Sequence, residues 1–217
     1  FRSHMTFLAS DLRQGREAGS PGYDIAAAYV ASQMAQLGLT PMGDRQGSQA
    51  SYFQHVPLVA YRAADKGTLT LEDAAGHTTP LVFGEDFILR GDPVPGQPEL
   101  NAPLVFVGFG VVAPEHKRDD YKGVDVRGKI VVAFTGAPKA YQTEERAYYG
   151  NARTKSAAAL EHGAAGLLLV NTPTQEKLYP FANAARQYAS WGMTWRGSDD
   201  KPFIPSPLPS AGLISVA

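Results

Sequence analysis

Three short apolar runs constrain the fold of this chain more than any other feature. They cover Leu104–Val112, Ile130–Phe134 and Gly166–Val170, and glycine, proline or polar residues lie close to their ends. Short apolar runs rich in valine, isoleucine and phenylalanine are typical of strands that are buried on both faces. The runs therefore predict buried strands of one sheet system in a mixed α/β fold.

An alanine-rich helix is predicted between the second and third of these strands. It covers Thr154–His162 and ends before Gly163, which suits a helix C-terminus. Its apolar residues are Ala157, Ala158 and Leu160. Because alanine side chains permit close approach, we expect these residues to lie against or beside the sheet.

The first part of the chain is predicted to be helical. Residues 1–12 read as a short helix, and a longer one begins at Ser20–Pro21, a helix cap followed by proline at the first helical position. Gly38 and Pro41 end this second helix. Its apolar stripe consists of Ala26, Val30, Met34 and Leu37.

Shorter elements are expected between the helices and the apolar runs. Turn residues at 65–67 and 73–76 separate strand-like segments. These segments are Tyr52–Tyr61, Thr68–Glu72, Leu81–Phe83 and Phe87–Leu89. Residues 90–103 are rich in proline and glycine and read as a linker or long loop.

Composition excludes several classes of function. The 217 residues carry a net charge of -1 without a basic stripe, so nothing indicates nucleic-acid binding. No apolar run is long enough to span a bilayer. The chain has 0 cysteines, which excludes disulfides, thiolate nucleophiles and cysteine-type zinc sites.

Two glycine-containing segments imitate nucleotide-binding motifs. Gly123–Lys129 has the spacing of a phosphate loop, but Ile130 replaces the required Ser or Thr and a strand follows instead of a helix. Gly108–Ala113 has the spacing of a dinucleotide fingerprint, but Pro114 follows it, which disfavours the required helix. We interpret the first as a β-turn before a core strand and the second as glycines at a bend in a strand.

Two acidic pairs and the histidines are the remaining candidates for metal or acid–base chemistry. Glu144–Glu145 is better explained by a solvated helix start than by a metal site, and Asp119–Asp120 by a turn than by a cation site. The histidines are His4, His55, His77, His116 and His162. None is spaced with a second ligand, and a zinc site needs several converging ligands. No catalytic residue and no metal ligand is therefore assigned.

Two blocks of sequence resemble zinc aminopeptidases of metallopeptidase family 28. The first resembles their amino-terminal segment, and its main parts are Phe7–Asp11, Gly15–Gly19, Pro21–Tyr23, Leu37–Leu39 and Ser51–Gln54. The second is similar to the core of the protease-associated (PA) domain inserted in these enzymes, and its parts are Phe106–Gly110, Asp119–Tyr121, Asp125–Val132, Lys155 and Gly163–Asn171. Found together in this order, the two blocks are a specific signature of the family.

The resemblance implies a division into two parts. Residues 1–60 would be an incomplete, amino-terminal helical segment of an αβα catalytic domain. Residues 61–217 would be a β-rich PA domain with flanking helices, with its C-terminal end truncated at Ala217, inside an apolar segment. The helix stripe around Val30, Met34 and Leu37 would then be under-packed, because it would face a catalytic domain absent from this chain.

The resemblance also implies a function for the parent protein. It would be a secreted or periplasmic enzyme that hydrolyses amino-terminal peptide bonds with two zinc ions. In the family the zinc ligands follow the PA insert, so this chain would hold no cofactor and be inactive. Its partners would be its own catalytic domain and, through that domain, a peptide substrate. A free-standing peptide- or protein-binding module without catalysis is the alternative.

The aromatic density of residues 179–203 indicates a binding surface. Both tryptophans of the chain lie there. We predict a mobile surface loop or short helix that borders the substrate cleft of the intact enzyme, with Gly192 and Gly197 as hinges. The expected rim residues are Tyr188, Trp191, Trp195 and Arg196. Aromatics that merely close one end of a β-rich core are the open alternative.

Overall fold

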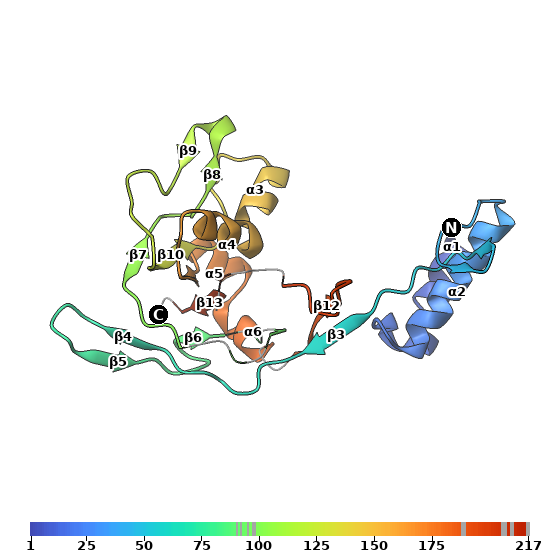
Figure 1. Ribbon diagram of the computed structural model, residues 1–217, viewed down its shortest axis with the longest axis horizontal. Helices are drawn as coiled ribbons and strands as arrows, with labels where there is room; N and C mark the ends of the chain where they lie inside the picture. The colour runs from blue at the N-terminus through green and yellow to red at the C-terminus, as the bar shows by residue number, and fades with distance from the viewer. Residues whose placement is uncertain are drawn as a thin grey trace. The chain divides into compact units, whose positions relative to one another are not determined.

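The computed structural model describes residues 1–89, 91, 93, 94, 96, 99–187, 190–204, 208 and 211–215 (Figure 1). The chain divides into two compact units. Unit 1 is Phe1–Pro57 and unit 2 is Leu58–Ala217. Among the helices within the described ranges, none is long and apolar enough to cross a membrane.

Unit 1 is built around one long helix. Its elements are α1 (Arg2–Leu8), η1 (Asp11–Arg16), α2 (Pro21–Gln36), β1 (Arg45–Gln46) and β2 (Gln49–Ala50). The predicted start of α2 is confirmed, because the Ser20 side chain accepts a hydrogen bond from the Tyr23 N–H. Its end is confirmed by Gly38, whose φ is 70°. The first helix stops at Leu8, earlier than predicted, and the chain then turns into η1.

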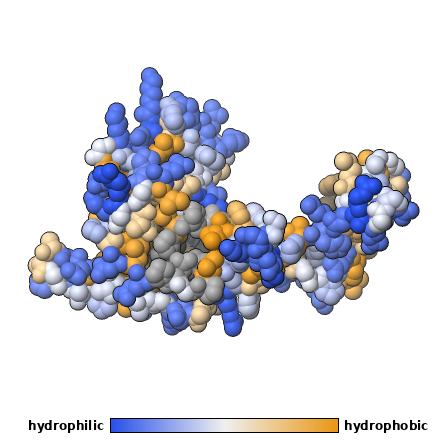
Figure 2. Space-filling model, viewed as in Figure 1, coloured by the Kyte–Doolittle hydropathy of each residue, from blue (hydrophilic) through white to orange (hydrophobic). Residues whose placement is uncertain are grey.

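The α2 stripe is largely exposed within unit 1. Val30 and Met34 are 41% and 37% exposed, and Leu37 is 76% exposed, whereas Ala26 is buried. The predicted under-packing of the stripe is thereby confirmed for these residues. Hydrophobic residues are also visible on the surface of unit 1 in Figure 2.

Unit 2 contains a five-stranded sheet with the order β6-β13-β11-β10-β7. Its strands are β6 (Phe87–Ile88), β7 (Leu104–Phe106), β10 (Ile130–Phe134), β11 (Gly166–Val170) and β13 (Ala211–Ile214). The last four strands run parallel to one another, and β6 is antiparallel to its neighbour β13. The predicted strands at 130–134 and 166–170 are confirmed, and β11 is buried because it lies in the centre of the sheet.

The first apolar run behaves differently from the prediction. Only Leu104–Phe106 is a strand of this sheet, and it lies at the edge, so Leu104 and Phe106 are exposed. The chain then turns through Gly108 and Gly110, whose φ values are 69° and 63°. The prediction of one long buried strand is therefore wrong. The interpretation of these glycines as bend residues is confirmed.

Two small hairpins and a ribbon complete the β-structure of unit 2. The elements are β3 (Leu58–Tyr61), β4 (Thr70–Glu72), β5 (Thr78–Pro80), β8 (Val112–Ala113), β9 (Arg118–Asp119) and β12 (Gly192–Trp195). The pairs are β3–β12, β4–β5 and β8–β9, all antiparallel. Of the short predicted strands, Leu81–Phe83 forms none and contributes only a bridge from Phe83 to Phe87. Residues 52–57 are also not in a strand.

Helices and helical turns connect these strands. They are η2 (Pro114–His116), α3 (Thr143–Gly150), α4 (Ala152–Glu161), α5 (Pro173–Leu178) and α6 (Phe181–Arg186). Hydrophilic residues dominate the end of unit 2 that carries β8, β9 and α3 on the face shown in Figure 2. The turn predicted at Gly123–Lys129 is confirmed, since Gly128 has a φ of 66° and β10 follows.

Helix α4 packs on β11, but with a different face from the one predicted. Its buried residues are Lys155, Ser156 and Ala159. Of the residues predicted to lie against or beside the sheet, the half-buried Ala158 packs against the core, whereas Ala157 and Leu160 are exposed. Ala159 joins the core cluster that includes Val131 and Leu167. The stripe was misplaced because a buried lysine does not look like a core residue in a sequence.

Ala159→Leu is expected to destabilise unit 2 by about 1–3 kcal/mol, because the larger side chain must enter a filled core. Ala159 is 0% exposed. Ala157→Leu makes the same change on the exposed face of the same helix and is expected to stay within about 0.5 kcal/mol of the parent. Urea denaturation of both variants tests this assignment of the helix face. Equal losses would contradict it.

A charged cluster lies beneath the β7–β8 turn. The Lys155 side chain is 1% exposed, and its ammonium donates a hydrogen bond to the Phe109 carbonyl. Arg118 Nη2 lies 2.8 Å from Asp120 Oδ1, and the Asp120 side chain is 11% exposed. Asp120 Oδ2 also accepts a hydrogen bond from the Val111 N–H at 3.0 Å. The turn predicted at Asp119–Asp120 begins at Asp120, and these contacts hold the Asp120 carboxylate inward.

Candidate functional site

The aromatic segment is organised by the β3–β12 ribbon. In its register Gly192 pairs with Tyr61 and Trp195 with Leu58, residues more than a hundred positions apart in the sequence. Thr194 is buried and its hydroxyl donates a hydrogen bond to the Phe203 carbonyl at 2.7 Å. The Phe203 N–H in turn donates to the Trp195 carbonyl at 2.8 Å. These two hydrogen bonds hold the chain around Phe203 along the edge of β12 that does not pair with β3.

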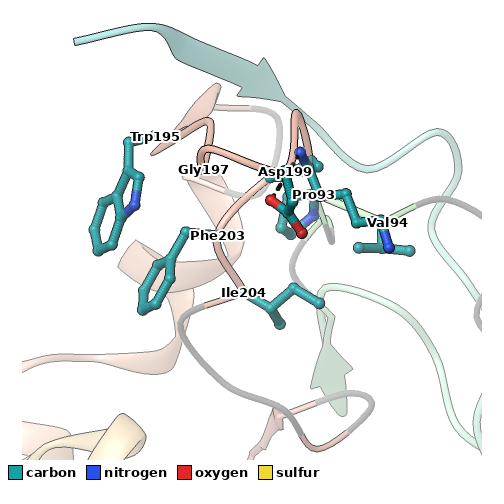
Figure 3. Close-up of a pocket in the computed structure, with 9 residues that line it drawn as sticks. Pro93, Val94, Trp195, Gly197, Asp199, Phe203 and Ile204 are labelled. Atoms are coloured by element: carbon teal, nitrogen blue, oxygen red, sulfur yellow. Dashed lines mark hydrogen bonds between the residues drawn. The ribbon is translucent and has the colours of Figure 1, made fainter.

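Trp195 and Phe203 form a stacked aromatic pair. Their ring centroids lie 3.8 Å apart and their planes are 12° from parallel. The two residues remain 46% and 39% exposed, so the stack leaves ring surface available to a ligand. Figure 3 shows the two rings side by side.

This stack is one wall of a pocket of about 470 Å³. The pocket is lined by Pro93, Val94, Trp195, Gly197, Asp199, Lys201, Pro202, Phe203 and Ile204 (Figure 3). Most of these groups are apolar, with one carboxylate and one ammonium among them. Such a lining suits an apolar side chain and the adjoining polar backbone of a peptide.

A second, smaller pocket lies at the other end of β12. Its volume is about 190 Å³ and it is lined by Tyr61, Arg62, Ile88, Leu89, Gly91, Ala184, Gln187, Ser190, Trp191 and Gly192. The Arg62 guanidinium carbon lies 4.9 Å from the centroid of the Trp191 ring, a cation–π contact. Trp191 is 59% exposed. Each tryptophan therefore borders its own pocket.

The structure brings three of the four predicted rim residues onto this ribbon. Trp191 borders the smaller pocket and Trp195 the larger one. Arg196 lies next to Trp195 but pairs with Asp200 at 3.1 Å and lines neither pocket. Tyr188 lies outside the described residues. Within the described ranges, the segment contains the short helix α6, one of the two predicted alternatives, and the strand β12, which was not predicted.

The glycines of the segment serve close packing. A Cβ on Gly192 would lie 2.6 Å from the Tyr61 ring, and one on Gly197 would lie 2.8 Å from Asp199 Oδ1. Neither residue has a positive φ. Close approach is the physical reason for these glycines, and nothing in the structure requires them as hinges.

Sequence reasoning missed the residues that complete the two pockets. Phe203 was the last residue of the predicted aromatic segment, Tyr61 ended a separate predicted strand, and Arg62 lay outside every predicted element. Their role depends on the pairing of β3 with β12, for which a single sequence carries no local signal. Pro93 and Val94 lay in the predicted linker.

The acidic pairs and histidines are distributed over separate places. Glu145 caps α3 by accepting from the Gln142 N–H, and Glu144 is exposed in the same turn, so a helix start is confirmed. Each histidine ring has its own hydrogen-bond partner. The partners are Tyr29 for His4, Asp44 for His55, Asp73 for His77, Glu145 for His116 and the Ala158 carbonyl for His162. Within the described residues, no three His, Asp or Glu side chains are grouped to hold a metal ion.

Comparison with known proteins identifies one region of the chain. The sequence model of the PA domain matches residues 100–208, half of the 217 residues. This region contains β7, the β8–β9 hairpin, β10, α4, β11 and the aromatic ribbon strand β12. No curated protein matches the sequence.

Several solved structures are similar to the chain. An aminopeptidase from Aneurinibacillus sp. strain AM-1 has 17% identity and a TM-score of 0.43, over 99% of this chain and 38% of that one. Two structures of BSAP, a zinc aminopeptidase from Bacillus subtilis, have 19% and 18% identity and TM-scores of 0.29 and 0.30, over 78% of this chain. The present chain spans 32% to 38% of the length of these proteins.

Proposed function

Because this chain belongs to the PA domain family through residues 100–208, we propose that it is the non-catalytic, PA-domain part of a zinc aminopeptidase. The support for the parent enzyme is the resemblance of residues 7–58 to the amino-terminal segment of such enzymes. In this proposal, hydrolysis and the two zinc ions belong to a separate catalytic domain. The parent acts outside the cytoplasm.

The proposed task of the PA unit is to bind extended peptide segments and so shape their access to the catalytic domain. The observation that carries this proposal is the exposed Trp195–Phe203 stack on the wall of the 470 Å³ pocket. Rigid aromatic side chains provide a large contact area at a low cost in side-chain entropy. The stack is further held by the Phe203 and Thr194 hydrogen bonds to the backbone, so little ordering remains for the ligand to impose.

The lining also favours a peptide over a purely apolar ligand. Asp199 and Lys201 place one negative and one positive group on the pocket wall. Backbone N–H and C=O groups of a bound peptide can bond to both kinds of group. Apolar peptide side chains can meanwhile contact Trp195 and Phe203.

Trp195→Ala is expected to weaken the binding of an extended, phenylalanine-containing peptide amide by about tenfold or more, because truncating a central aromatic contact costs the most at interfaces. Trp195→Phe keeps an aromatic partner for Phe203 and is expected to retain most of the affinity. Calorimetric titration of the purified 217-residue chain measures both effects.

Tyr179→Ala is the matched control. Tyr179 belongs to the same aromatic segment and is 73% exposed, but it does not line the pocket. Equal losses of affinity in Trp195→Ala and Tyr179→Ala would contradict the assignment. Turnover of an aminoacyl chromogenic substrate by the purified chain with added zinc would contradict its non-catalytic role.

A further inference from the structure

The smaller pocket differs from the larger one in its charge. Its lining includes Arg62, Tyr61, Gln187 and Ser190, and none of the described residues that line it is an aspartate or glutamate. All four groups can donate hydrogen bonds. Its remaining surface is apolar and includes the buried Ile88.

Among the described residues, the Arg62 side chain has an aromatic partner and no carboxylate partner. Its guanidinium lies over the Trp191 ring, and within the described parts of the chain no carboxylate lies within ion-pair distance of it. Arg196, which directly follows β12, has the opposite arrangement, because Asp200 pairs with it at 3.1 Å. An arginine stacked on an aromatic ring keeps the edge of its guanidinium free, and that edge matches the two oxygens of a carboxylate.

We propose that this pocket binds a carboxylate group of a peptide through the Arg62 guanidinium, with Trp191 orienting it. The volume of about 190 Å³ suits one such group together with a short aliphatic stem. The source is either the carboxyl terminus of the peptide or an aspartate or glutamate side chain. This inference rests on the proposed peptide-binding function of the same ribbon and specifies the class of peptide.

The spacing of the two pockets adds a length requirement. Trp191 and Trp195 are four positions apart on one chain that is extended through β12, which corresponds to roughly 13 Å at about 3.3 Å per residue. An extended peptide covers this distance with about four residues. The preferred ligand therefore carries its carboxylate about four residues from an apolar or aromatic side chain.

The two tryptophans allow each pocket to be observed separately. Both tryptophans of the chain lie on this ribbon. Trp195→Phe leaves Trp191 as the reporter at the smaller pocket.

The probes are an acetylated hexapeptide with phenylalanine at position two, once as the free acid and once as the carboxyl-terminal amide. A second pair of amides carries glutamate or glutamine at position six.

The expected result is that the free acid binds about tenfold or more tightly than the amide and changes the Trp191 fluorescence. Arg62→Gln is expected to erase this difference between the free acid and the amide, and added salt should weaken binding of the acid only. If the glutamate amide, instead of the free acid, binds more tightly than its uncharged counterpart and loses this advantage in Arg62→Gln, the bound carboxylate belongs to a side chain. Arg62→Lys keeps the charge but not the two-oxygen geometry and is expected to lose most of the difference.

Two other outcomes overturn the inference and are distinguishable. If carboxylate and amide peptides bind equally, or if both Arg62 variants retain the preference, the carboxylate pocket is wrong and the peptide-binding function stands. If none of the peptides binds the chain, the proposed function fails together with the inference.

Discussion

Asp120→Asn is expected to lower the free energy of unfolding of unit 2 by about 3–5 kcal/mol, because it removes the negative charge of a largely buried cluster. Asp120 lies 2.8 Å from Arg118, and its carboxylate also acts on the buried ammonium of Lys155. Asparagine preserves the shape and the acceptor for the Val111 N–H. Unfolding by urea, followed through the two tryptophans of unit 2, measures the loss.

Lys155→Met provides the control for this prediction. Methionine has a similar length and no charge, so it relieves the excess of positive charge that Asp120→Asn creates. It also leaves the Phe109 carbonyl without the ammonium donor, which limits the gain. The double variant is expected to be more stable than Asp120→Asn alone. A loss below about 1 kcal/mol in Asp120→Asn, or no rescue in the double variant, would contradict the assigned role of the cluster.

Raising the pH from about 8 towards 10.5 is expected to increase the free energy of unfolding by up to about 3 kcal/mol. Burial lowers the pKa of the Lys155 amine from 10.5 to about 8, although the Asp120 carboxylate opposes this shift. Between these two pH values the unfolded chain holds a proton on Lys155 that the folded chain has released. The unfolded state then binds more protons, so stability rises with pH.

A tyrosine limits this gain at high pH. The Tyr149 hydroxyl donates a hydrogen bond to the Glu115 carboxylate, which raises the pKa of Tyr149 to about 12. Above about pH 10 an unfolded tyrosine has lost its proton while the folded one keeps it, so stability falls with pH there. Maximum stability is therefore expected between about pH 9 and 10. Urea titrations from pH 7 to 9.5 test the rise, which Lys155→Met should abolish; an equal rise in that variant would contradict the assignment to Lys155.

The most predictable parts of the fold are those with strong local patterns. The central strands β10 and β11 are continuous apolar runs, and α2 has a cap, a proline and a terminal glycine in the expected places. The edge position of β7 was not predictable, because the order of strands in a sheet is decided by long-range pairing. The buried face of α4 was missed for a different reason, namely that its largest buried side chain is Lys155.

The candidate site shows the same limit. Aromatic density alone pointed to Trp191 and Trp195, and both border pockets. The residues that give these pockets their chemistry come from distant segments, with Arg62 on the β3 side of the ribbon and Phe203 beyond β12. The prediction that this segment borders the cleft of an intact enzyme stays a prediction.

The most direct test of the central claim is the mapping of peptide binding on the isotope-labelled 217-residue chain by amide chemical-shift perturbation. The account predicts that an extended phenylalanine-containing peptide shifts the amide signals of Leu58–Arg62, Trp191–Trp195, Gly197–Lys201 and Phe203–Ile204, and leaves those of the β8–β9 hairpin and α4 unchanged. Shifts confined to β8, β9 and α4, or no shifts at millimolar peptide, would contradict it.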